Sequence, residues 1–145
     1  MKLIPKAPNY EAIVRNSFSQ QGLMANFSAS ISNISPGLIE LSAPLTPKVS
    51  QQQGFGHAGL TFALGDSAAG YAALSLMAEG NEVLTAEMKI NLLAPAKGDR
   101  VFARGRVVKP GRRLIVVTSE VFCEDNDQIQ QIALLQGTMV PVTLG

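Results

Sequence analysis

Residues 57–79 form an almost unbroken run of small and apolar amino acids, and this run constrains the fold more than any other part of the chain. It predicts one long helix, and a helix that is apolar on nearly all sides belongs in the interior of a protein. Asp66 is the only charged residue between positions 58 and 78. Burying an ionised carboxylate without a partner costs several kcal/mol, so Asp66 needs a functional or structural explanation.

The segment before this helix predicts a shorter helix and a hairpin. Residues 9–20 can form an amphipathic helix that ends at Gly22. In residues 27–32 apolar side chains alternate with serines, which is a strand pattern. A Ser-Pro-Gly turn at 35–37 and a second short strand at 38–45 complete the hairpin.

After Gly80, which ends the long helix, the pattern changes to strands. The alternation is clearest in the first of them, where one face carries Leu84, Ala86, Met88, Ile90 and Leu92. Turn signals separate three further strands at 101–109, 114–124 and 129–142. The order is therefore a hairpin, one buried helix and four strands, which is an α+β arrangement.

A single antiparallel sheet cannot cover all sides of such a helix, and it leaves its edge strands open. We therefore expect the chain to self-associate through the sheet or the helix. The length of 145 residues predicts one domain, 1–145, with residues 1–23 as an N-terminal helical segment.

Composition excludes several classes of function. Hydrophobic residues make up 46% and charged residues 16%, so the chain is not disordered, and a net charge of +1 predicts no nucleic-acid partner. One cysteine excludes an internal disulfide and a cysteine-based metal site within one chain, and a single histidine disfavours a histidine-rich zinc site. The start lacks a signal-peptide pattern, which predicts a cytoplasmic protein. Residues 58–78 could span a membrane by length, but Asp66 at mid-depth disfavours this.

The loop before the long helix carries a recognisable pattern, Gln51-x-x-Gly54-x-x-His57-Ala58-Gly59, with Asp66 further on. This pattern resembles the PaaI-like (phenylacetate-pathway) branch of the hotdog-fold thioesterases, and residues 85–95 resemble the third strand of that family. The resemblance implies a hotdog fold, in which a curved antiparallel sheet wraps a long central helix. It also implies an acyl-CoA substrate, a homodimer or homotetramer, and no membrane partner.

The chain departs from the family pattern at two positions. Gln51 replaces the usual asparagine, although related hotdog thioesterases also use glutamine. Ala58 replaces the first glycine after the histidine, and it keeps the backbone N–H that would contact an oxyanion. If the backbone at that position needs a positive φ, alanine would be strained.

The resemblance assigns candidate catalytic roles. Asp66 would be a general base or a nucleophile, and the N–H groups of Ala58 and Gly59 at the helix start would stabilise an oxyanion. The Asp66 that completes the site would come from the other subunit. The alternatives are a buried aspartate held for structure and an ordinary helix N-terminus.

The remaining candidates have supporting roles. Gln51 would position water or the thioester carbonyl, His57 would orient the helix start, and Thr85 would lie near the nucleophile. Phe62 would line the acyl pocket. Each could equally be a plain structural residue: a loop glutamine, a satisfied polar histidine, a β-branched strand residue or an apolar helix residue.

Basic residues are concentrated between positions 97 and 113. Arg112 and Arg113, beside a glycine turn, are the candidates for binding the phosphates of coenzyme A. A solvated strand face is the alternative, and nucleic-acid binding is disfavoured because the stretch has one aromatic residue, Phe102, and lacks the interleaved aromatics of a stacking platform.

The sequence therefore predicts a cytoplasmic, homo-oligomeric acyl-CoA thioesterase that needs no cofactor. A hotdog dehydratase or hydratase is a second enzyme class, but the chain lacks the histidine and acidic arrangement those enzymes use. The non-enzyme alternative is an acyl-CoA-binding or scaffolding domain in which Ala58 has impaired the oxyanion site.

Overall fold

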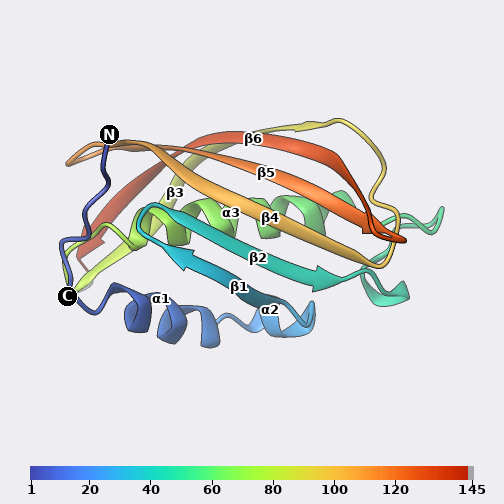
Figure 1. Cartoon of the computed structure of the whole chain (residues 1–145), viewed down its shortest axis with the longest axis horizontal. Helices are drawn as coiled ribbons and strands as arrows, with labels where there is room; N and C mark the ends of the chain where they lie inside the picture. The colour runs from blue at the N-terminus through green and yellow to red at the C-terminus, as the bar shows by residue number, and fades with distance from the viewer. Residues whose placement is uncertain (144–145) are drawn as a thin grey trace.

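The computed structural model describes residues 1–143 and contains one long helix and one sheet (Figure 1). The hairpin, the long helix and the four following strands appear in the predicted order. The elements are α1 (Tyr10–Ser19), α2 (Gly22–Asn26), β1 (Ser30–Ser35), β2 (Leu38–Pro44), the 3-10 helix η1 (Pro47–Val49), α3 (Ala58–Leu74), β3 (Asn81–Leu92), β4 (Arg100–Pro110), β5 (Ile115–Asp125) and β6 (Gln128–Thr143).

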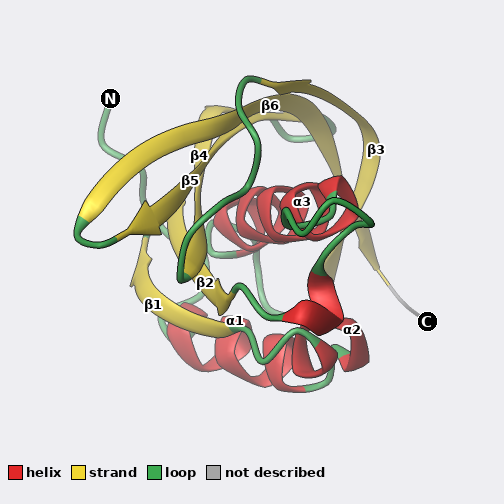
Figure 2. Ribbon diagram, turned by 90° about the vertical axis from the view of Figure 1, so that its right-hand side faces the viewer, coloured by secondary structure: helices red, strands yellow, loops and turns green. Residues whose placement is uncertain are grey.

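The six strands form one antiparallel sheet with the order β1-β2-β4-β5-β6-β3. Figure 2 looks nearly along α3 and shows the sheet curving around it, with α1 and α2 on the side that the sheet leaves open. This confirms the predicted α+β class and the wrapped central helix. β1 and β3 are the two edges of the sheet, and β3 lies beside α3.

Small residues let α3 approach the sheet closely. Leu64, Ala68 and Ala72 are fully buried against the strands. Gly105 of β4 faces Ala68, and a Cβ atom at Gly105 would lie 2.2 Å from the Ala68 carbonyl carbon. No side chain fits there, so glycine at this position permits the contact between helix and sheet.

Two predicted boundaries in the helices are wrong. α3 ends at Leu74, before Gly80, because Ser75 ties the chain down. The Ser75 hydroxyl donates to the Ala72 carbonyl at 2.7 Å and accepts the N–H of Gly37, in the β1–β2 turn, at 2.8 Å. Gly22 does not end the first helix; it begins α2 after the chain has already turned beyond α1.

The predicted alternation of β3 is interrupted by a bulge between Thr85 and Glu87. Because a bulge adds one residue to one strand, the inward and outward positions change places on either side of it. Met88 and Ile90 are half-buried as predicted. Leu84 is 56% exposed and Val83 packs against the core in its place, so the prediction that Leu84 shares their face is wrong.

Among the described residues, no helix is both long enough and apolar enough to cross a membrane. α3 has 17 residues and carries Asp66 at its middle.

Candidate active site

The start of α3 is fixed by the side chain of His57. His57 is the N-cap residue, and its Nδ1 atom accepts the N–H of Gly59 at 2.7 Å, while its own backbone N–H donates to the Val49 carbonyl at 2.8 Å. The N–H of Gly59 is therefore already engaged. The N–H of Ala58 has no acceptor within the described part of the chain, so it is the donor that remains available at the positive end of the helix dipole.

Ala58 has an ordinary backbone conformation. The non-glycine residues with positive φ among those described are Ser28, Asn126 and Asp127. Alanine at position 58 is therefore unstrained, and it keeps its backbone N–H.

Gln51 belongs to a tight turn that leads to the helix. Its N–H donates to the Phe55 carbonyl at 2.8 Å, and its carbonyl accepts the N–H of Gly54 at 3.1 Å, where φ is +87°. Its side-chain oxygen accepts the N–H of Gln53. A cavity of about 450 Å³ brings Gln51 and Ala58 together with the end of β3.

The far wall of this cavity consists of residues that the sequence analysis did not single out, chiefly Leu92, Leu93 and Ala94. Leu92 and Leu93 are each 57% exposed. The signal in the sequence that could have identified this wall was the pair of leucines just before the proline turn. We call this cavity the thioester groove, after the substrate that we propose for it.

Asp66 lies on α3 in a different environment. The Thr85 hydroxyl, at the bulge of β3, donates to Asp66 Oδ1 at 2.8 Å. Partial burial raises the pKa of Asp66 above its ordinary value, and the bond from Thr85 lowers it by less. The second carboxylate oxygen accepts no hydrogen bond from residues 1–143. A small cavity of about 170 Å³ adjoins this pair, and it also contains Ser17, Gln21 and Tyr71.

One chain does not bring Asp66 to Ala58. Eight residues of α-helix separate them by about 12 Å along the axis and by about 80° around it, and they line separate cavities. Phe62, which is 36% exposed, lies between them on the uncovered side of the helix. Ala58, Phe62 and Asp66 thus form a stripe with four-residue spacing, and β3 runs beside it.

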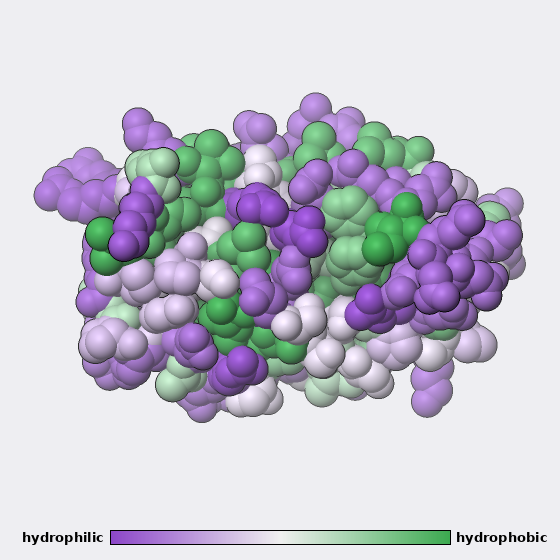
Figure 3. All heavy atoms as spheres, in the orientation of Figure 1, coloured by the Kyte–Doolittle hydropathy of each residue, from purple (hydrophilic) through white to green (hydrophobic). Residues whose placement is uncertain are grey.

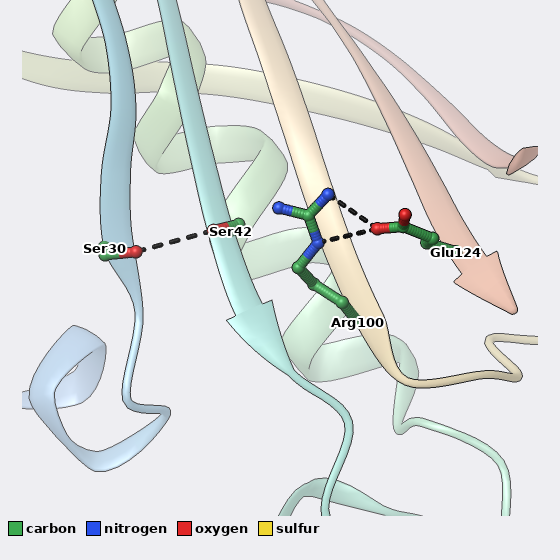
Figure 4. Close-up of polar contacts among 4 residues, drawn as sticks. All are labelled: Ser30, Ser42, Arg100 and Glu124. Atoms are coloured by element: carbon green, nitrogen blue, oxygen red, sulfur yellow. Dashed lines mark hydrogen bonds and ion pairs between the residues drawn. The ribbon is translucent and has the colours of Figure 1, made fainter. Parts of the chain in front are cut away.

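Two of the basic residues are engaged on the sheet. Arg100 donates two hydrogen bonds to Glu124 Oε2, at 3.0 and 2.6 Å (Figure 4). Arg104 pairs with Glu40 at 2.5 Å. The same two guanidinium groups lie over the stacked rings of Phe102 and Phe122.

Arg112 and Arg113 lie in the turn after β4, at the opposite end of the molecule from the groove. Arg100 at the start of β4 pairs with Pro44, just before the loop that leads to α3. The 11 residues of β4 extend about 33 Å from there. A role for Arg112 and Arg113 in binding coenzyme A stays a prediction, and a single chain does not bring them to its own groove.

Residues 53–130, more than half of the chain, match the family model of the thioesterase superfamily. A thioesterase family protein from Silicibacter pomeroyi is 42% identical, and its structure superposes with a TM-score of 0.91 over 93% of this chain and 99% of that one. The chain belongs to the thioesterase superfamily, and the predicted hotdog fold is confirmed.

Two further relatives extend the comparison. The PaaI protein of the Escherichia coli phenylacetic acid degradation operon is 20% identical, covers 94% of this chain and 96% of its own, and has a TM-score of 0.82, so it shares the fold. A putative esterase from Saccharolobus solfataricus is 35% identical over 81 residues, 56% of this chain. The match spans 53% of that relative, so this chain aligns with about half of its length.

Proposed function

We propose that this protein hydrolyses acyl-CoA thioesters at a site that two copies of the chain build together. One observation carries the proposal: a free N–H at Ala58 and a half-buried carboxylate at Asp66 occupy one exposed stripe of α3, too far apart to act together within one chain. The stripe lies beside β3, which is an open edge of the sheet.

A two-fold axis near Met88 of β3 would bring Ala58 of one copy and Asp66 of the other together. Antiparallel pairing of two β3 edges around that point brings the Leu92 end of one strand beside the Leu84 end of the other. Both leucines are more than half exposed in one chain. Pairing covers them and closes the open edge, and it brings the thioester groove beside Asp66 of the partner subunit.

The structures of a relative support the choice of residues. A thioesterase from Staphylococcus aureus, 31% and 28% identical in two structures, was crystallised with alanine in place of a glutamate and, separately, of a glutamine. Those two positions are separated by the same number of residues as Gln51 and Asp66. The spacing favours Gln51 and Asp66 as the paired polar groups of the site.

The chemistry follows from these groups. The Ala58 N–H donates to the thioester carbonyl oxygen and stabilises the negative charge that develops there. Asp66 takes a proton from water, whose oxygen attacks the carbonyl carbon, and then gives that proton to the departing thiolate as the carbon–sulfur bond breaks. The raised pKa of Asp66 suits this exchange. Direct attack by Asp66, giving an anhydride that water then opens, uses the same geometry.

The groove continues toward a positive charge. A second hollow of about 280 Å³ contains Gly56 and Ala96, which also line the groove, and it adds Lys97. We assign the pantetheine arm to the groove and a phosphate of coenzyme A to Lys97.

The test is hydrolysis of aryl, short-chain and medium-chain acyl-CoAs by the wild type, by Asp66→Asn and by Glu79→Gln. Glu79 is an exposed carboxylate beyond α3 and serves as the matched control. We expect Asp66→Asn to lose roughly a hundredfold or more and Glu79→Gln to keep its rate. A folded Asp66→Asn protein that keeps its rate would contradict the mechanism, and tight binding without turnover by the wild type would favour the non-catalytic alternative.

A further inference from the structure

A second cavity, of about 440 Å³, lies at the end of the molecule opposite the thioester groove. It is bounded by the N-terminal segment, the turn after α3 and the β4–β5 turn. Its walls include Leu76, Met77 and Ile115, which are almost fully buried. Figure 3 shows hydrophilic and hydrophobic residues side by side at the end that carries the N-terminus. We call this cavity the terminal pocket.

The N-terminal wall of the terminal pocket is held in place by packing. Leu3 fills the space beside Gly37, where a Cβ atom would lie 2.3 Å from Leu3 Cδ1. Ala7 is only 2% exposed. Leu3 and Ala7 thus hold this segment against the protein, and the neighbouring residues Lys2 and Lys6 have a fixed backbone.

The charged side chains that line the terminal pocket are all positive. Its lining contains three cations, Lys2, Lys6 and Arg112, and no acidic side chain from residues 1–143. None of the three forms an ion pair within that range. Arg100 and Arg104, by contrast, are each matched to a glutamate. Three exposed cations without an acidic partner among residues 1–143 therefore surround an apolar floor.

We propose that the terminal pocket binds a small amphipathic anion, with an apolar body on the floor and a carboxylate or phosphate head between Arg112 and the lysines. A cavity of this volume is in the range of small-molecule sites. The guanidinium of Arg112 offers paired donors for a planar or tetrahedral anion.

Within one chain this site is separate from the proposed site of hydrolysis. α3 alone, with 17 residues, separates the two ends by about 25 Å. Two of the three cations, Lys2 and Lys6, also lie outside residues 53–130, the segment that matches the superfamily. The terminal pocket is therefore built partly from a segment that the superfamily match does not include.

Calorimetric titration with three eight-carbon probes tests the ligand class. Octanoate carries the anion, octanol has the same tail without charge, and octylammonium reverses the charge. We expect octanoate to bind at least about tenfold more tightly than either control, since its charged head gains charge-assisted hydrogen bonds. Equal binding of octanol, or tight binding of inorganic phosphate alone, would overturn the proposal.

Matched variants locate the site. Arg112→Gln should weaken octanoate binding about tenfold, whereas Arg113→Gln should leave it unchanged, because Arg113 does not line the pocket. If Arg112→Gln does not fold, Lys6→Gln replaces it with the same expectation. Asp66→Asn should bind octanoate as the wild type does.

Three results would contradict the assignment. Equal losses in Arg112→Gln and Arg113→Gln would indicate a diffuse charge effect. A change of octanoate affinity in Asp66→Asn, in either direction, would place the probe in the catalytic site. Binding to anionic lipid vesicles that depends on Arg112, without binding of free octanoate, would make this end a membrane-contact surface.

Discussion

The two sides of α3 have the same kind of sequence and opposite surroundings. On one side Leu64, Ala68 and Ala72 are fully buried under the sheet. On the other side Ala58, Phe62 and Asp66 form the exposed stripe beside the open edge of β3. On the first side, small apolar residues allow the helix and the sheet to pack closely. The second side, which includes Phe62 and Asp66, is the one on which we propose that a substrate and another copy of the chain bind.

This difference shows how far apolar composition can be interpreted. A helix apolar on all sides predicts burial, but it does not distinguish burial within one chain from burial between two. Asp66 bears on that distinction, because its burial is incomplete in one chain and Thr85 is its one hydrogen-bond partner among residues 1–143.

The buried side should be the less tolerant of change. Gly105→Val would push a side chain into the backbone of Ala68, only 2.2 Å from the first added atom. We expect the free energy of unfolding to fall by about 3 kcal/mol or more, measured by urea denaturation. Gly22→Ala is the control, since nothing lies within 4 Å of an added Cβ atom there. A Gly105→Val protein as stable as the wild type would contradict the packing described for this side.

Substitutions on the exposed side should leave the stability of the protein unchanged and reduce its activity. Ala58→Pro removes the free N–H without breaking the helix, because Ala58 is the first residue of α3, where proline is favoured. His57 already has the extended conformation that a following proline requires, with φ −66° and ψ 140°. We expect unchanged thermal stability and a loss of roughly 10²–10³ in kcat on the best acyl-CoA. Retained activity would remove Ala58 from the mechanism.

A smaller effect is expected at Thr85. The bond from Thr85 lowers the pKa of Asp66, in opposition to burial, which raises it. Thr85→Val should therefore raise the pKa of Asp66 further and move the acidic limb of the pH–rate profile to higher pH, because the base works only when ionised. Thr138→Val is the control, since its hydroxyl donates to Glu87 and not to Asp66. A profile that stays in place, or moves to lower pH, would contradict this account of Asp66.

The order of elements could be predicted because each depends on local signals. The 35–37 turn, the apolar run and the alternation from Met88 onward are encoded in adjacent residues. The end of α3 could not be predicted, because it depends on the bond between Ser75 and Gly37, which are 38 positions apart. The bulge at Thr85 depends in the same way on pairing with β6.

The proximity of some candidate residues could be predicted, whereas the layout of the candidate site could not. Gln51 and Ala58 line one groove, and the Thr85 hydroxyl is bonded to Asp66, while the catalytic roles of these residues stay predictions. The position of Arg112, at the far end of β4, follows from strand direction and length. A run of basic residues in the sequence carries no such information.

Complementation between two inactive variants tests the shared site most directly. Ala58→Pro and Asp66→Asn chains, each inactive alone, would be unfolded together, refolded and assayed for acyl-CoA hydrolysis. If each site takes Ala58 from one chain and Asp66 from the other, half of the dimers are mixed and each has one intact site, so about a quarter of the wild-type rate should return. A mixture that stays inactive while mass spectrometry shows mixed dimers would contradict the account.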